Sequence, residues 1–130
     1  MKKQGGVIVN MASITAHIAV QNRFAYTTTK GAVLAMTNAI AKDYIANGIR
    51  CNSVSPARVH TPFVDNFLNK NYPGEEKEMF ENLSHTQPIG RMGKPQEVGD
   101  LVLYLCSEEA SFITGTDFPI DGGFIKLNGN

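Results

Sequence analysis

The sequence lacks an excess of charge of either sign and lacks any long apolar run. Twelve basic residues balance twelve acidic ones, so the composition favours neither nucleic acid nor an anionic membrane as a partner. No stretch approaches the ~20 apolar residues of a membrane-spanning helix. Apolar residues make up 42% and charged residues 18% of the 130-residue chain, which is typical of one globular domain.

Cysteine is scarce as well, with Cys51 and Cys106 far apart and outside any C-x-x-C spacing. This pattern is typical of reduced thiols in a cytosolic protein. Met1-Lys2-Lys3 precedes the apolar residues Val7-Ile8-Val9, but Asn10 ends that run before it reaches the length of a secretory signal. We therefore expect a cytoplasmic protein whose first apolar run is a buried strand.

Histidine is equally sparse, and its positions do not form a metal-ligand pattern. His17, His60 and His85 are too scattered for a ligand set and are expected on loops or at the surface. Four glutamates gather between Glu75 and Glu81, where we interpret them as the solvated face of a helix. The sequence predicts no metal site.

Against these absences stands one compact pattern, Tyr26-Thr27-Thr28-Thr29-Lys30, at the predicted start of a long helix. Residues four apart lie on one face of a helix, so Lys30 should place its ammonium near the ring of Tyr26. A nearby positive charge favours the phenolate and lowers a phenol pKa that is otherwise near ~10. The spacing therefore predicts a tyrosine that serves as a general acid or base near neutral pH.

Ser13 follows a run with the pattern of a buried parallel strand. The run from Val7 to Ala12 is largely apolar and begins with a β-branched stretch, and Gly5-Gly6 stands in front of it. Ligands of open α/β sheets bind beyond the carboxyl ends of the strands. Ser13 is therefore a candidate site residue, although a lone serine more often caps a turn.

A long helix and a second strand follow. Asn22 is the expected N-cap of a helix over residues 23–46, which Asn47-Gly48 ends with a left-handed residue. Residues 49–55 alternate apolar and polar positions as a strand does, and Pro56 stops this strand.

The remaining segments complete an α/β pattern. Residues 58–88 are too long for a tight connection and hold two helical pieces, near Val64–Leu68 and Glu75–Leu83, which suggests a substrate lid. Pro95 opens another helix, and Asp117–Ile120 reads as a final short strand. The order predicts a doubly wound parallel sheet with right-handed crossovers.

Ser13, Tyr26 and Lys30 together suggest redox chemistry at an alcohol or carbonyl group. A hydroxyl, a phenol and an ammonium suit the movement of a proton to or from a substrate oxygen while hydride moves at the attached carbon. Because no side chain donates hydride, the set implies a nicotinamide cofactor.

At this point the sequence closely resembles the short-chain dehydrogenase/reductase family. Tyr26 and Lys30 match its Y-x-x-x-K motif, and Asn52 to Pro56 match its N-x-V-x-P motif. Gly115 and the Asp121-Gly122-Gly123 run resemble its carboxyl-terminal segment. The resemblance covers essentially the whole chain.

The resemblance implies roles for individual residues. Ser13 would polarise the substrate carbonyl, and Tyr26 would donate or accept the proton. Lys30 would lower the pKa of Tyr26 and hold the ribose hydroxyls of NAD or NADP. The implied cofactor-binding residues are Tyr26, Lys30, Pro56, Val59 and Thr61. Ala57 departs from the family, which usually has glycine after the proline.

Arg23 and Arg91 are the predicted substrate-binding arginines, together with the hydroxyl of Ser13. Arg23 lies three residues before Tyr26, and Arg91 follows the predicted lid. Either guanidinium could clamp a carboxylate with two hydrogen bonds. The predicted substrate is a secondary alcohol or ketone, with a hydroxy acid or sugar acid as the refinement that these arginines favour. A surface or helix-capping role is the alternative for both.

The resemblance also defines what this sequence does not contain. Family members are roughly twice as long because a Rossmann sheet has two mononucleotide-binding halves. No G-x-G-x-x-G turn for the pyrophosphate occurs here. Residues 1–130 therefore resemble a single partial domain, the carboxyl-terminal catalytic half of such an enzyme. The alternatives are a non-catalytic relic or oligomerisation module and, less well supported because G-x-S-x-G is lacking, a serine hydrolase.

Association with other copies is expected on two grounds. By resemblance, the helix that carries Tyr26 would form an interface in a homo-oligomer, commonly a tetramer. The strand over residues 7–12 would also lie at a sheet edge, without the neighbour that the full family sheet provides. Unpaired edge groups on an apolar strand promote association.

Overall fold

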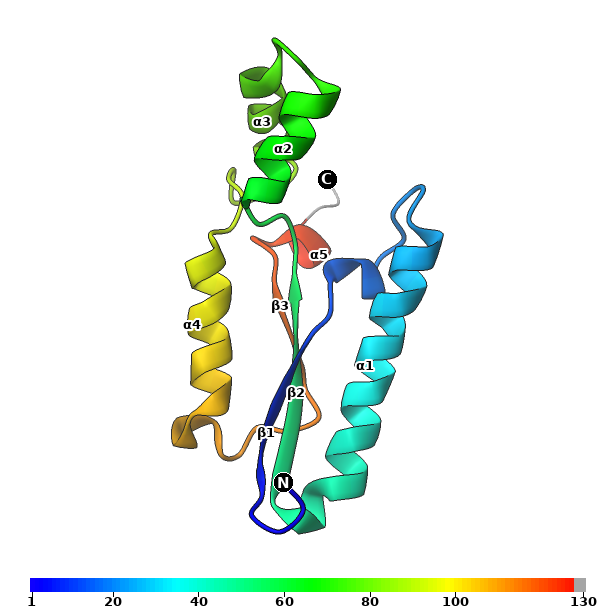
Figure 1. Ribbon diagram of the computed structural model, residues 1–130, viewed down its shortest axis with the longest axis vertical. Coiled ribbons are helices and arrows are strands. Elements are labelled where there is room, and N and C mark those ends of the chain that lie inside the picture. Colours follow the sequence, from blue (N-terminus) through cyan, green and yellow to red (C-terminus); the bar gives the residue numbers. More distant parts are fainter. Residues whose placement is uncertain (128–130) are drawn as a thin grey trace.

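The computed structural model describes residues 1–127, which form one parallel sheet flanked by helices (Figure 1). The strands are β1 (Gly6–Met11), β2 (Ile49–Pro56) and β3 (Asp117–Ile120). Their spatial order is β1-β2-β3, with Gly6 opposite Ile49 and Ser53 opposite Asp117. This confirms the predicted α/β fold with three parallel strands.

Helices cover both faces of the sheet. The helices α1 (Phe24–Tyr44) and α4 (Pro95–Cys106) lie on opposite sides in Figure 1. On one face, the Asn10 amide of β1 donates to Thr37 of α1 at 2.9 Å. On the other, Arg50 of β2 donates to the carbonyl of Leu105 in α4 at 3.0 Å. The sheet is therefore wound on both faces, as predicted.

The two crossover connections have opposite hands. Both step one strand along the sheet in the same direction, yet α1 and α4 cover opposite faces (Figure 1). Because the β1–α1–β2 connection is right-handed, the β2–α4–β3 connection is left-handed, against the strong general preference. The prediction of right-handed crossovers is wrong for this second connection. Its helical insertion separates β2 from α4, so the short link that usually fixes the hand is missing.

The insertion corresponds to the segment that the sequence suggests as a lid. It contains α2 (Pro62–Asn71) and α3 (Glu76–His85), which pack against each other beyond the carboxyl ends of the strands (Figure 1). Both predicted helical pieces are confirmed. The first is longer than expected because Pro62 occupies the first turn, where its fixed φ suits a helix.

Shorter elements complete the described chain. Three 3-10 turns are η1 (Ile14–Ala16), η2 (Ile45–Asn47) and η3 (Glu108–Ala110), and α5 (Phe124–Leu127) follows β3. None of the helices within residues 1–127 is long and apolar enough to cross a membrane.

The start of α1 differs from the prediction. Asn22 has a left-handed φ of 60° and lies outside the helix, and Arg23 takes the N-cap position without a side-chain cap bond. Asparagine adopts this left-handed conformation at lower cost than most residues. At the other end, Gly48 has a φ of 66° and its N–H bonds the carbonyl of Ile45, which confirms the predicted stop.

The central strand β2 forms the core of the molecule. Cys51 and Val54 are fully buried, and so are its polar residues Asn52, Ser53 and Ser55. Burial raises the pKa of the Cys51 thiol, although a hydrogen bond from Asn10 acts in the opposite direction. Cys51 is a free thiol, as is the exposed Cys106, in agreement with the prediction.

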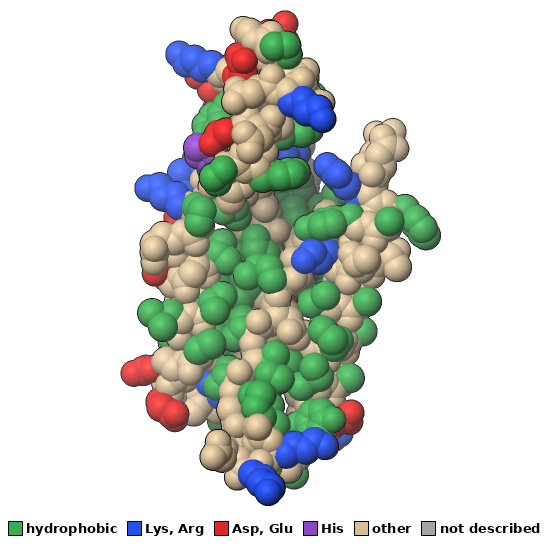
Figure 2. All heavy atoms as spheres, in the orientation of Figure 1, with side chains coloured by type: hydrophobic (Ala, Val, Ile, Leu, Met, Phe, Trp, Pro, Cys, Tyr) green, Lys and Arg blue, Asp and Glu red, His purple; other side chains and the backbone are tan. Residues whose placement is uncertain are grey.

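Among the described residues 1–127, the strand β1 has a sheet neighbour on one side only, where it pairs with β2. Figure 2, in the orientation of Figure 1, shows hydrophobic side chains gathered over β1 and along the sides of α1 and α4 that flank it. Unpaired N–H and C=O groups therefore lie in an apolar setting, which favours pairing with another strand.

We expect the 130-residue chain, produced alone, to self-associate as its concentration rises through the micromolar range, because of this free edge. Size-exclusion chromatography with light scattering over a hundredfold range of concentration, on the order of 1 to 100 µM, measures the mass. A monodisperse monomer throughout, with a sharp thermal unfolding transition, would contradict this expectation.

Candidate active site

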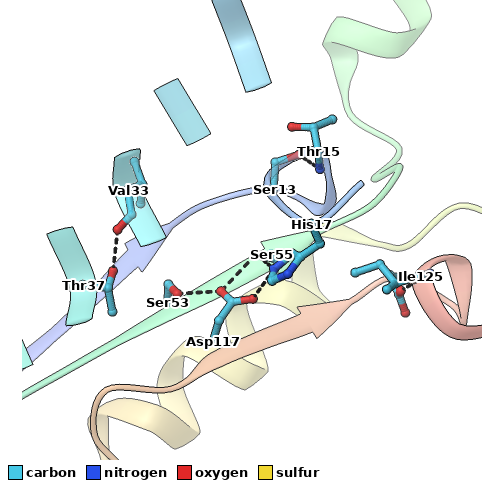
Figure 3. Close-up of polar contacts among 10 residues, drawn as sticks. Ser13, Thr15, His17, Val33, Thr37, Ser53, Ser55, Asp117 and Ile125 are labelled. Atoms are coloured by element: carbon cyan, nitrogen blue, oxygen red, sulfur yellow. Dashed lines mark hydrogen bonds and ion pairs between the residues drawn. The ribbon is translucent and has the colours of Figure 1, made fainter. Parts of the chain in front are cut away.

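Ser13 lies directly beyond the carboxyl end of β1, where the chain turns (Figure 3). It is 6% exposed and caps η1, because its Oγ accepts a hydrogen bond from the Thr15 N–H at 3.3 Å. The serine's own proton is not used in this bond. Ser13 is thus both the turn-capping residue of the simple interpretation and a hydroxyl donor at the edge where α/β sheets bind ligands.

Lys30 connects the first turns of α1 to the end of β1. Its Nζ donates to the Met11 carbonyl at 2.8 Å and lies 5.7 Å from the centre of the Tyr26 ring. Tyr26 is 46% exposed, so its ring is accessible to a ligand. The predicted approach of Lys30 to Tyr26 is confirmed. The turn that carries Ser13 packs against the same helix, so the three residues come from adjacent elements.

Two buried hydroxyls flank this group without partners in the described chain. The Oγ1 atoms of Thr15 and Thr27 are inaccessible and accept or donate no hydrogen bond within residues 1–127. Thr15 lies two residues after Ser13, and Thr27 directly follows Tyr26. An unsatisfied buried hydroxyl costs roughly 1–3 kcal/mol, so stability is sacrificed locally at this position, as functional sites often require.

The loop after β2 holds the predicted cofactor-binding residues Pro56, Val59 and Thr61. Pro56 ends β2, Val59 forms a parallel bridge with Gly93, and Thr61 caps α2. Ala57 has no positive φ and donates its N–H to the Ile120 carbonyl. Alanine in place of the family's glycine therefore needs no left-handed backbone at this position.

Arg23, at the start of α1, faces a second arginine that the sequence did not single out. Burial first, and then the charge of Arg23, lower the pKa of Arg58 in the loop after β2. Arg58 Nε donates to Thr86 Oγ1 at 3.1 Å. Neither guanidinium forms an ion pair within the described part of the chain. Two cationic groups thus lie near the start of α1 without a carboxylate partner within residues 1–127.

Arg91 forms an ion pair inside the chain. Its guanidinium donates to both Glu97 carboxylate oxygens, at 2.9 and 2.6 Å, and to the Met92 carbonyl. Glu97 also accepts the Lys94 N–H at 2.7 Å. The Arg91 side chain holds the pKa of Glu97 at about 2, below its usual 4.5. The structure thus gives Arg91 a partner within the chain, and its contact with a substrate stays a prediction.

Sequence reasoning missed a polar cluster around His17 (Figure 3). His17 Nε2 lies 2.7 Å from Asp117 Oδ2, and Asp117 Oδ1 accepts hydrogen bonds from Ser53 at 2.5 Å and Ser55 at 2.9 Å. The only signal in the sequence was that Ser53 and Ser55, two apart on a strand, share a face. Nothing in it linked that face to His17 or Asp117.

The His17 cluster does not have the order of a hydrolase triad. The Ser55 hydroxyl donates to Asp117, and His17 Nε2 lies closer to that carboxylate than to Ser55 Oγ, at 2.7 against 3.3 Å. In a triad the histidine accepts the serine proton through one nitrogen and contacts the carboxylate through the other. The cluster gives the hydrolase alternative no support.

Comparisons with known proteins find similar dehydrogenases and reductases. A family model described as enoyl-(acyl carrier protein) reductase matches residues 1–125. The chain is 41% identical over 125 residues to 2-keto-3-deoxy-L-fuconate dehydrogenase of Xanthomonas campestris, across 95% of this chain and 41% of that protein. The solved L-sorbose reductase of Gluconobacter frateurii, complexed with NADPH and L-sorbose, superposes with a TM-score of 0.89 at 29% identity. The solved structure of a short chain dehydrogenase family protein of Francisella tularensis superposes with a TM-score of 0.88 at 38% identity.

The chain belongs to the short-chain dehydrogenase/reductase family. The two structural alignments cover 95% and 94% of this chain but 49% and 52% of the solved chains. The chain therefore spans about half the length of these family members. Tyr26 and Lys30, which match the family's Y-x-x-x-K motif, and Ser13 stand at the carboxyl edge of the sheet.

Replacing Glu97 with glutamine should remove an acid-sensitive part of the stability. Because the pKa of Glu97 falls from 4.5 to about 2 on folding, its contribution is complete above pH 4.5 and is lost as the pH falls towards 2. The unfolding temperature of the parent chain should therefore exceed that of Glu97→Gln at neutral pH, and the difference should vanish near pH 2.

Thermal unfolding followed by circular dichroism across this pH range measures the effect. Glu81→Gln is the matched control, because Glu81 is an exposed glutamate that forms no ion pair within residues 1–127. A gap between the parent chain and Glu97→Gln that stays constant with pH would contradict the assignment.

Proposed function

We propose that this chain is the catalytic half of an NAD- or NADP-dependent oxidoreductase that interconverts a secondary alcohol and a ketone. One observation carries the proposal: Lys30 Nζ is held 2.8 Å from the Met11 carbonyl and 5.7 Å from the Tyr26 ring centre. This contact brings an ammonium, a phenol and the end of the strand leading to Ser13 together.

The three side chains divide the proton chemistry among them. In the direction of ketone reduction, the Ser13 hydroxyl donates a hydrogen bond to the substrate carbonyl oxygen and polarises it. Tyr26 donates its phenolic proton to the same oxygen, which becomes the alcohol hydroxyl. The Lys30 charge, fixed beside the ring, stabilises the phenolate that remains. In alcohol oxidation each step runs in reverse.

The residues present fit the nicotinamide end of a dinucleotide. An ammonium has three donors, and Lys30 uses one of them on the Met11 carbonyl, which leaves two for ribose hydroxyls. Pro56, Val59 and Thr61 border the same edge on a loop held by hydrogen bonds between its backbone and that of Gly93. When bound, the nicotinamide supplies or accepts the hydride that no side chain can carry. The pyrophosphate has no glycine-rich turn to bind within these 130 residues.

The alternative is a chain that keeps the fold but does not bind a dinucleotide, and cofactor titration distinguishes the two. If the proposal holds, the fluorescence of NADH or NADPH changes saturably as the chain is added. The Tyr26→Phe variant should also turn over a secondary alcohol roughly 10²- to 10⁴-fold more slowly, which is the usual loss when a general acid/base is removed. Cofactor binding should persist in the variant, because the ring and Lys30 remain.

Tyr44→Phe is the matched control for Tyr26→Phe. Tyr44 lies at the other end of α1 and also has a lysine over its ring, with Lys2 Nζ 4.8 Å from the centre. This variant should retain full turnover. The absence of any saturable fluorescence change with either cofactor would favour the non-catalytic alternative.

We further propose that the substrate carries an acidic group, as a hydroxy acid or sugar acid does. Arg23 and Arg58 lie close enough for one charge to lower the pKa of the other, and neither has an ion-pair partner within residues 1–127. Two adjacent cations without a counter-charge favour binding of an anion. Arg23 is three residues before Tyr26, so a carboxylate bound there would hold an attached alcohol near the phenol.

Arg23→Ala should raise KM for hydroxy acids by about 10- to 100-fold, the value of a charge-assisted hydrogen bond, and should leave KM for neutral secondary alcohols nearly unchanged. Steady-state kinetics on matched acid and neutral substrates measures both. Lys70→Ala, a change of an exposed cation on the lid, serves as the control. Equal effects of Arg23→Ala on both substrate classes would refute the carboxylate clamp.

A further inference from the structure

We propose that His17 is a positioning residue, which holds the turn carrying Ser13 against the sheet through its hydrogen bond to Asp117. The proposed function enters only in giving Ser13 its catalytic importance. The cluster lies on the α1 face of the sheet and joins the end of β1 to the start of β3 across β2 (Figure 3).

Ser13 and His17 are the two ends of one short turn. Ser13 is the N-cap and His17 the C-cap of η1. The Ala16 N–H bonds the Ser13 carbonyl at 3.0 Å, and the His17 N–H bonds the Ile14 carbonyl at 2.9 Å. Together with the hydrogen bond from the Thr15 N–H to Ser13 Oγ, these bonds make the turn a compact unit. A restraint on His17 therefore restrains the Ser13 hydroxyl.

Asp117 offers His17 an immobile acceptor. Its carboxylate accepts from Ser53 and Ser55, both fully buried on the central strand, and its backbone pairs with Ser53 in the sheet. The Asp117 side chain is 16% exposed, so solvent competes little for the remaining oxygen. A hydrogen bond to a charged acceptor contributes more to stability than a hydrogen bond between neutral groups.

The single proton on His17 Nε2 is directed to this carboxylate. The Nε2 atom lies 2.7 Å from Asp117 Oδ2 and 3.3 Å from Ser55 Oγ, and the Ser55 hydroxyl already donates to Asp117. The ring therefore acts as a hydrogen-bond donor from the turn to the sheet. Without the ring, the turn loses this hydrogen bond to the sheet, and one oxygen of Asp117 loses its donor.

Hydrogen exchange at the Thr15 and Ala16 amides tests this role, since both N–H groups bond to Ser13. In His17→Leu, these amides should exchange about tenfold faster than in the parent chain, corresponding to the loss of one charged hydrogen bond. Amides of α1 and β2 should be unchanged. His17→Gln, whose side-chain amide can donate to Asp117, should restore protection to within about twofold.

His60→Leu is the matched control, because His60 forms a similar pair with Asp65 at 2.8 Å on the exposed lid. It should leave the Thr15 and Ala16 amides unaffected. If His17→Leu does not fold, His17→Gln and Asp117→Asn decide: the former should preserve protection and the latter should reduce it at the same two amides. Unchanged exchange in His17→Leu or Asp117→Asn, or loss of protection in His17→Gln, would overturn the proposal.

The measurement separates this inference from the proposed function. Hydrogen exchange needs neither substrate nor cofactor, so a chain without oxidoreductase activity can still show that His17 holds the turn. Conversely, activity lost on Tyr26→Phe with no effect of His17→Leu on exchange would support the enzyme and refute the positioning role.

Discussion

The pairing of β1 and β3 with the buried strand β2 is the constraint on which the rest of the structure depends. β2 forms the backbone hydrogen bonds of the sheet with both β1 and β3. Its pairing with β1 extends to a hydrogen bond from the Ala12 N–H to the Val54 carbonyl, one residue before Ser13. The same strand ends at Pro56, where the loop with the proposed cofactor-binding residues begins. Because parallel strands end at one edge, this pairing brings together residues of the proposed site that are far apart in the sequence.

The polar residues of β2 are buried because each has a structural partner. The Asn52 side chain donates to the Ile113 carbonyl and accepts from the Thr116 N–H, so it fixes the backbone that leads into β3. Ser53 and Ser55 donate to Asp117 and prepare the acceptor for His17. Fully bonded polar groups in a core specify one register, whereas unpaired groups would be costly. The strand therefore defines the sheet and orients the turn beside the site.

Charge is distributed unequally around the same edge. Arg91 is neutralised by Glu97 within the chain, whereas Arg23 and Arg58 have no such partner within residues 1–127. The first turn of α1 also contains no acidic residue, so the positive end of the helix dipole adds to these charges. The start of α1 beside the proposed site thus carries unpaired positive charge, although the chain as a whole has no net charge.

By itself the sequence determined the elements that depend on local pattern: three strands, the Tyr26 helix with its Gly48 stop, the two lid helices, and the contact between Lys30 and Tyr26. These follow from periodicity, turn residues and the geometry of one helix, which act over a few residues. The sequence misplaced the start of α1 because an asparagine that fits a cap also fits a left-handed turn. Only the tertiary structure decided the hand of the second crossover, the Arg23 and Arg58 pair, and the bond from His17 to Asp117. Each of these depends on how distant segments lie in space, and no local preference encodes that arrangement.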